Sequence, residues 1–140
     1  MKYPTAADLA FARQLLAHER SDDDLAANVA ERVYDQVHDR LAPVIGSAGV
    51  RALFFRSLKL ASLPGFVLPE GVAAREGASP GKHLHDHLRR MDPDAAAEDA
   101  ASVFAIFSGL LTTFIGVKVT TRVLYRDWPM GVEAITKETT

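Results

Sequence analysis

Hydrophobic residues recur along this chain at the three- and four-residue spacing of amphipathic α-helices, in five segments separated by turn-forming residues. The most regular stripe lies in the segment that Ser21 and Asp22 open and that Pro43 and Gly46 close. Its apolar positions are Leu25, Val29, Val33, Val37 and Leu41. No segment requires a β-strand. The pattern therefore predicts an all-α fold, a single bundle of four or five helices in one domain, residues 1–140.

Capping residues mark the starts of the other helices, since Ser, Thr and Asp side chains satisfy the first backbone N–H groups. These residues are Thr5, Ser47, Ser79 and Asp92, the last two each followed by a proline. The buried face predicted for the third helix is Val50, Leu53, Phe54, Leu58 and Ala61. Phe55 falls off that face. Glycines and prolines predict a long loop over residues 63–79, and residues 136–140 are expected to form a frayed tail.

The last helix is predicted to run from Asp92 to Arg126, a length of ~50 Å. Its residues 100–117 include no charged side chain. Because ~50 Å is long for a compact domain of this size, we expect the helix to bend at Gly109 or Gly116, or to project into a partner subunit. One broad apolar face holds Val103, Phe107, Leu110, Phe114 and Val117. The opposite side is also uncharged, so we expect the helix to be buried on all sides.

The same uncharged stretch is near the minimum length for a membrane span. Serine, threonine and glycine make up much of it, and only about half of it is strongly apolar, so a membrane-spanning role is not favoured. Asp8 and Arg13 lie where a signal peptide would need its apolar region. We therefore expect a cytoplasmic protein that does not associate with membranes.

Composition excludes several kinds of site. The formal net charge is −2 and the sequence pI is about 6.2, whereas a general nucleic-acid binder usually carries a strong basic excess. We therefore expect no nucleic-acid partner. Without cysteine, the chain has no disulfides, thiolate zinc sites or cysteine nucleophiles.

The run KHLHDHLRR holds the densest group of candidate metal ligands. His83 and His87 are four residues apart, so a helix places both side chains on one side. Two histidines that bind the same divalent metal ion require this arrangement. A third ligand would have to come from elsewhere in the chain, and His18, His38 and Glu70 are candidates. The alternative is a solvated polar helix face with no metal, and we predict no cofactor for the leading hypothesis below.

Three cations near the end of the last helix, Lys118, Arg122 and Arg126, are spaced four residues apart. Such a stripe could hold a phosphate or a carboxylate. The simpler interpretation is compensation of the negative end of the helix dipole together with weak surface ion pairs.

Two segments carry a resemblance to known proteins. TFIGVKVTTRVLYRDWP, residues 113–129, resembles the C-terminal part of a group of short all-helical bacterial proteins of unknown function, and LAPVIGSAGVRALFFRSL, residues 41–58, is similar to an earlier segment of the same group. The resemblance implies a bacterial origin and transfers no functional residue.

No catalytic signature accompanies these features, so the leading hypothesis is a small non-catalytic interaction or regulatory module. We expect a homodimer that also binds an unidentified protein partner, with Phe55, Phe66 and Val67 as contact residues. One alternative is a metal-binding sensor or metal-dependent enzyme that uses His83 and His87. Another is a small-molecule-binding domain with a dry cavity beneath the loop. That cavity would be lined by Phe54, Phe66 and Phe107.

Overall fold

A computed structural model of the chain describes residues 6–19, 25–68, 71 and 79–126, and every structural statement below concerns these residues. They form six α-helices and one π-helical turn, without a strand among them, so the predicted all-α bundle is confirmed. The elements are α1 (Ala6–Glu19), α2 (Ala26–Ile45), α3 (Ser47–Ala61), α4 (Pro80–Leu88), α5 (Pro93–Ile115), α6 (Val117–Thr120) and the π-helical turn η2 (Thr121–Arg126).

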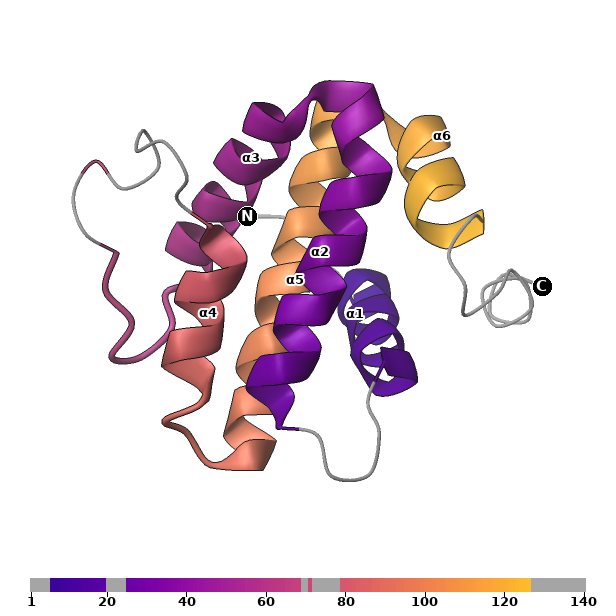
Figure 1. Cartoon of the computed structure of the whole chain (residues 1–140). Helices are drawn as coiled ribbons and strands as arrows, with labels where there is room; N and C mark the ends of the chain where they lie inside the picture. Colours follow the sequence, from indigo (N-terminus) through magenta and orange to yellow (C-terminus); the bar gives the residue numbers. More distant parts are fainter. Residues whose placement is uncertain (1–5, 20–24, 69–70, 72–78, 127–140) are drawn as a thin grey trace.

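The two long helices α2 and α5 lie side by side in the middle of the bundle and run in the same direction (Figure 1). α3 and α4 cover one side, and α1 and α6 lie on the other. Because α2 and α5 are parallel, the chain turns back at the same end of the molecule twice, once from α2 into α3 and once from α5 into α6.

Two of the predicted caps are confirmed. The Ser79 hydroxyl accepts a hydrogen bond from the Lys82 backbone N–H at 3.3 Å, and the Asp92 carboxylate accepts one from Asp94 N–H at 3.2 Å. The prediction for Ser47 is wrong, because Gly46 occupies the cap position of α3 and Ser47 is its first residue. Ser21 and Asp22, predicted to open the second helix, lie outside the described residues. The predicted start is nevertheless too early, because Leu25 is extended and α2 begins at Ala26.

The predicted bend in the last helix is present at Gly116, which separates α5 from α6; the other candidate, Gly109, lies buried within α5. Gly116 has φ 91° and ψ 160°, and Gly46, between α2 and α3, has φ 84° and ψ 152°. This backbone conformation is available essentially only to glycine. Each glycine therefore allows a sharp reversal in a single residue. Pro43 does not end α2, which continues past it to Ile45.

The core forms between α5 and the helices around it. Phe54 of α3 packs against Phe104 and Phe107 of α5, with ring centroids 5.3 and 5.4 Å away. The prediction that Phe55 lies off the buried face of α3 is wrong: only 3% of this residue is exposed, because α4 covers that side of the helix. α5 has the length and hydropathy of a membrane-spanning helix, but 56% of its most apolar window is buried inside the bundle, as expected of a core helix.

Residues 26–46 and 96–116 are two copies of one sequence pattern, offset by 70 positions. Seven of these 21 position pairs are identical, and the pattern ends in both copies with Ile-Gly. The identical residues are Ala26/Ala96, Ala27/Ala97, Ala30/Ala100, Val33/Val103, Leu41/Leu111, Ile45/Ile115 and Gly46/Gly116. Because both glycines also adopt the same backbone conformation, α2 and α5 are equivalent helices of an internal repeat.

The helices that precede them are equivalent as well. α1 packs mainly on α5 and α4 packs mainly on α2, so the first helix of each half covers the long helix of the other half. Arg13 on α1 contacts Glu98, and His85 on α4 contacts Asn28, the position 70 residues before Glu98. Arg13 and His85 are therefore counterparts, which sets an offset of 72 residues between α1 and α4.

Candidate functional site

Three large hydrophobic side chains are exposed where the two Ile-Gly reversals lie. The exposed fraction is 45% for Val44, 65% for Phe114 and 67% for Val117. Val44 and Phe114 are counterparts in the repeat. Val44 lies two residues before Gly46 and Phe114 two residues before Gly116, the two glycines with positive φ at the reversals. We call this surface the corner face and define it by Val44, Phe114, Val117, Lys118 and Arg122.

The exposure of Phe114 and Val117 corrects the prediction that α5 is buried on all sides. α5 is buried from Val103 to Gly109, and burial becomes incomplete over its last turn. At that point α5 has reached the end of the bundle and the chain reverses at Gly116, so the last turn extends past the core. Apolar side chains at such an end gain nothing from exposure to water, and patches of this kind commonly mark interaction sites.

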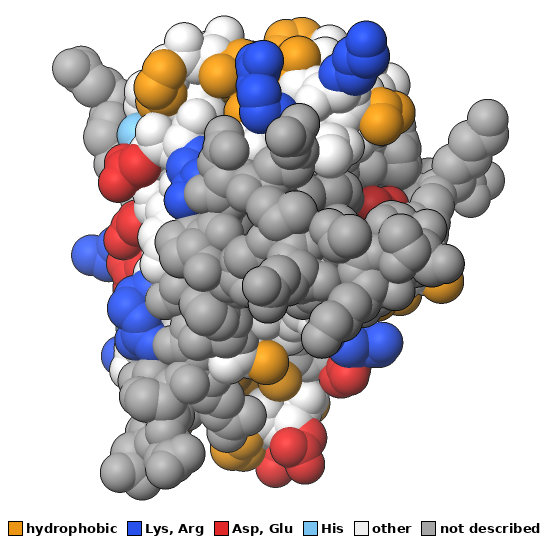
Figure 2. Space-filling model, turned by 90° about the vertical axis from the view of Figure 1, so that its right-hand side faces the viewer, with side chains coloured by type: hydrophobic (Ala, Val, Ile, Leu, Met, Phe, Trp, Pro, Cys, Tyr) orange, Lys and Arg blue, Asp and Glu red, His pale blue; other side chains and the backbone are white. Residues whose placement is uncertain are grey.

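The exposed hydrophobic residues lie in two ranges of the sequence that contain cations and no acidic residue. Neither residues 40–68 nor residues 100–126 contain Asp or Glu; the first range holds four cations and the second three. Figure 2 shows hydrophobic and basic side chains together at the end of the molecule where the chain reverses, and the acidic side chains in this view lie farther down. The acidic residues of α2 and α5 lie before these ranges. The one nearest a reversal is the exposed Asp39, ~9 Å along α2 from Ile45.

Two of the three predicted anion-binding cations, Lys118 and Arg122, are exposed in this region; the side chain of Arg126 lies outside the described residues. The simpler interpretation, compensation of the dipole of one continuous helix, assumed that these cations end that helix. α5 instead ends at Ile115 with no basic residue in its last turn, and Lys118 belongs to the short helix that follows. Compensation of the α5 dipole therefore does not explain these cations.

The histidines of α4 lie between the helices rather than on a solvated face. His83 packs against Phe55 with ring centroids 5.9 Å apart, and His87 meets the edge of Phe66 at 5.1 Å. The loop predicted over residues 63–79 therefore contacts α4 through Phe66. Val67, the next residue, is exposed.

His87 also faces an acidic residue across the interface of α4 and α5. Its Nε2 atom lies 3.6 Å from Oδ2 of Asp99, and the side chains are only 12% and 20% exposed. Both atoms are buried without a hydrogen-bond partner. The repeat places Leu15 and Val29, both buried, at the equivalent positions of the first half. One half of the fold thus holds a polar pair where the other is apolar.

A metal at His83 and His87 would need a third ligand. Over residues 6–19, 25–68, 71 and 79–126, no three His, Cys, Asp or Glu side chains are grouped closely enough to hold an ion. His38 forms a 2.7 Å hydrogen bond through Nε2 with the Ser47 hydroxyl. The side chain of His18 and the whole of Glu70 lie outside the described residues. The metal hypothesis remains an untested prediction.

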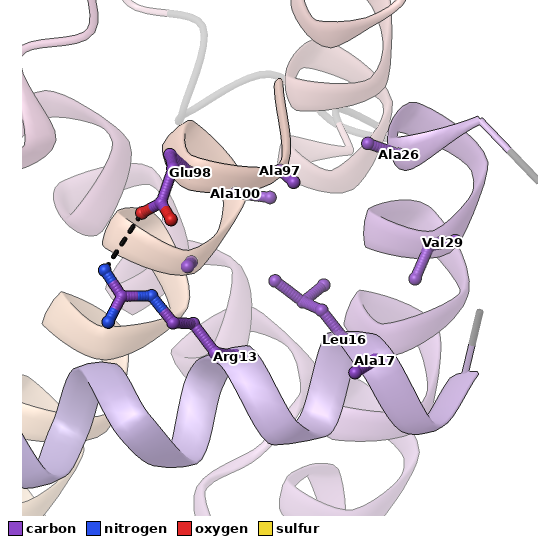
Figure 3. Close-up of a pocket in the computed structure, with 9 residues that line it drawn as sticks. Arg13, Leu16, Ala17, Ala26, Val29, Ala97, Glu98 and Ala100 are labelled. Carbon is purple, nitrogen blue, oxygen red and sulfur yellow. Dashed lines mark hydrogen bonds and ion pairs between the residues drawn. The ribbon is translucent and has the colours of Figure 1, made fainter. Parts of the chain in front are cut away.

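A small cleft lies at the opposite end of the bundle from the corner face, near the starts of α2 and α5. Its volume is about 220 Å³, and its walls are mostly alanine with Leu16 and Val29 (Figure 3). Arg13 Nη2 donates a 3.1 Å hydrogen bond to Glu98 Oε2 at one side of the cleft. Drug-sized ligands usually occupy roughly 300–1,000 Å³, so this cleft suits only a small apolar group.

The cavity predicted beneath the loop would be lined by Phe54, Phe66 and Phe107. Phe54 and Phe107 instead pack against each other in the core. Phe66 lies against His87. The structure does not bring the three rings together around a space in the described part of the chain.

Sequence reasoning missed the corner face because helical periodicity assigned Phe114 and Val117 to the buried face. The signal that could have identified it is the repeat. Ile-Gly occurs at residues 45–46 and 115–116. Each time a large hydrophobic residue, Val44 or Phe114, precedes it and a new helical segment follows it. Two equivalent chain reversals place their hydrophobic residues at an end of a bundle rather than in its middle.

No protein-family model, curated protein sequence or solved structure matches this chain. The resemblance of residues 41–58 and 113–129 to short bacterial helical proteins remains a prediction.

Proposed function

We propose that this chain is a non-catalytic interaction module that binds its partner through the corner face. The observation that carries the proposal is the exposure of Phe114 and Val117 next to Lys118 and Arg122. Hydrophobic and basic side chains grouped at one end of a bundle form a surface suited to binding, since burial of the apolar groups supplies affinity and the charges select the partner.

The other contact residues expected from the sequence support this choice less well. Phe55 is buried in the bundle, and Phe66 packs against His87. Val67 is exposed, but no cation or second large exposed hydrophobic residue of the described chain adjoins it in sequence. The corner face combines three exposed hydrophobic residues with two cations.

Site-specific photocrosslinking in cells that produce the protein tests the proposal. Benzoylphenylalanine replaces Phe114 in one variant and Ala95 in a matched control. Ala95 is exposed and lies on the same helix at its opposite end. We expect an adduct of defined composition from position 114 and none of the same kind from position 95.

Absence of any adduct from position 114, or the same adducts in equal yield from both positions, would contradict the proposal. Both variants must show the helical circular dichroism and the thermal transition of the parent protein, so that crosslinking is compared between folded chains.

A further inference from the structure

We infer that the partner of the corner face is the surface of an anionic phospholipid bilayer. This inference rests on the proposed function and adds the chemical class of the partner. It replaces the expectation of no membrane association, whose grounds concern only a helix that spans the bilayer. Here the contact is peripheral and α5 remains the core helix of the bundle.

The corner face exposes the kinds of side chain that a peripheral membrane contact uses. A monotopic contact places Phe, Leu or Val side chains among the lipid headgroups and Lys or Arg beside them. Phe114 and Val117 project from the chain reversal of the second half, and Val44 projects from the equivalent reversal of the first half. Lys118 and Arg122 are exposed and follow Val117 in the sequence by one and five residues.

The charge at the end of the molecule that holds the corner face is complementary to an anionic surface. The whole chain carries a formal net charge of −2, so the molecule as a whole is not attracted to an anionic surface. The acid-free ranges 40–68 and 100–126 each include one of the reversals at the end that holds the corner face, and Asp39 immediately precedes the first range. The first turns of α5, at the other end, carry Asp94, Glu98 and Asp99. An anionic surface would therefore orient the molecule with the corner face toward it.

A protein surface, including that of a second copy of this chain, fits the corner face less well than a bilayer does. A two-fold contact between copies through this face would bring Lys118 and Arg122 of one protomer near the same cations of its partner, which is unfavourable. A stable protein–protein interface buries roughly 800 Å² on each partner, and three exposed large hydrophobic side chains supply only part of that. Shallow insertion among lipid headgroups needs no larger patch, because the cations contribute alongside.

Co-sedimentation of the purified full chain with vesicles tests the inference. One set of vesicles is pure phosphatidylcholine and the other is phosphatidylcholine with about one quarter phosphatidylglycerol. We expect binding to the anionic vesicles only, and a fall in binding as the ionic strength rises from about 0.05 M to about 0.5 M because salt screens surface charge.

Two variants separate the two contributions. Lys118→Glu/Arg122→Glu should lower the partition coefficient at least tenfold, since each cation near an anionic surface contributes about fivefold. Phe114→Ser/Val117→Ser should also lower it at least tenfold, while leaving the salt dependence in place. The matched controls are Lys82→Glu and Val67→Ser, which change an exposed cation and an exposed valine elsewhere and should bind as the parent does.

Absence of binding to anionic vesicles overturns the inference, and so does equal binding to neutral vesicles or an unchanged partition coefficient in both corner-face variants. The photocrosslinking experiment distinguishes this failure from failure of the proposed function. A protein adduct specific to position 114 without vesicle binding leaves the interaction module standing with a different partner. Failure of both experiments removes both.

Discussion

His87 and Asp99 lie on opposite sides of the contact between α4 and α5, with Nε2 and Oδ2 3.6 Å apart and neither atom hydrogen-bonded. Buried polar groups that lose water without gaining a hydrogen bond cost stability. The first half of the repeat has the buried residues Leu15 and Val29 at the equivalent positions. The helix arrangement therefore does not require a polar pair there.

We predict that His87→Leu/Asp99→Val, which copies the first half of the repeat, leaves the free energy of unfolding unchanged or raises it by up to about 4 kcal/mol, because it removes two buried polar atoms that lack hydrogen bonds. His87→Leu alone should lower it, because Asp99 would then be buried without its partner. Urea denaturation at pH 7 measures all three proteins. A double variant less stable than the parent would show that the polar pair stabilises the fold.

Gly46 and Gly116 should both be intolerant of a side chain. Their φ values of 84° and 91°, with ψ near 150–160°, lie in a region that costs other residues about 1–3 kcal/mol. A methyl group at either position would meet no atom within 4 Å, so the cost comes from the backbone and not from a clash. We expect Gly46→Ala and Gly116→Ala each to lower the free energy of unfolding by that amount in urea.

Gly49→Ala is the matched control, because Gly49 lies within α3 and an added Cβ would meet Ile45 side-chain atoms at an ordinary 3.5 Å. Alanine is favoured over glycine inside a helix by about 0.5–1 kcal/mol, so this variant should be as stable as the parent or slightly more so. If all three substitutions had the same effect, the backbone argument for the two reversals would be wrong.

Much of the fold could be predicted from local sequence signals. The Ser79 and Asp92 caps act within three residues of the chain, and the stripe from Val29 to Leu41 is a periodic feature of one helix. Phe55 could not be placed in this way. Its position 100° from Phe54 puts it off the α3 face that meets α5, and only the packing of α4 against α3 buries it.

The candidate site could be predicted only in part, since its location depends on where helices end in space. Lys118 and Arg122 were identified as cations, but the break at Gly116 changes their role from helix-dipole partners to neighbours of Phe114. Helical periodicity carries no information about where a bundle ends. It assigns Phe114 to the core because it counts residues along a helix and not the elements that cover them.

Gly81 differs from Gly46 and Gly116, because its φ is not positive and the Tyr34 ring leaves no room for a side chain. A Cβ at this position would lie 2.6 Å from Cδ2 and 2.9 Å from Cγ of Tyr34, whose ring is held against Phe54 at 4.7 Å. Gly81→Ala should therefore lower the free energy of unfolding by about 1–3 kcal/mol, the usual cost of overpacking. In the background of Tyr34→Ala the same substitution should cost less, and a double-mutant cycle in urea measures that difference. An equal cost in both backgrounds would remove Tyr34 as the cause.

Tyr34 should make stability depend on pH at the alkaline end. Burial, together with nearby Asp35, raises the pKa of the Tyr34 phenol to about 12 against the opposing effect of Arg51, whereas in the unfolded chain it is near 10. Below pH 10 the phenol is neutral in both states and its contribution is complete. Between pH 10 and 12 the unfolded chain ionises while the folded protein does not, so the free energy of unfolding falls by up to about 2 kcal/mol.

Tyr34→Phe isolates this effect, because lysines and the other tyrosines titrate in both proteins. The difference in the free energy of unfolding between parent and variant should be constant from pH 7 to about 10 and should shift in favour of the variant from about pH 10 to 12. Urea denaturation at closely spaced pH values provides the measurement. A difference in the free energy of unfolding that stays constant through pH 12 would mean that the phenol reaches water in the folded protein. The packing of Tyr34 against α3 and α4 would then be looser than its contacts with Phe54 and Gly81 require.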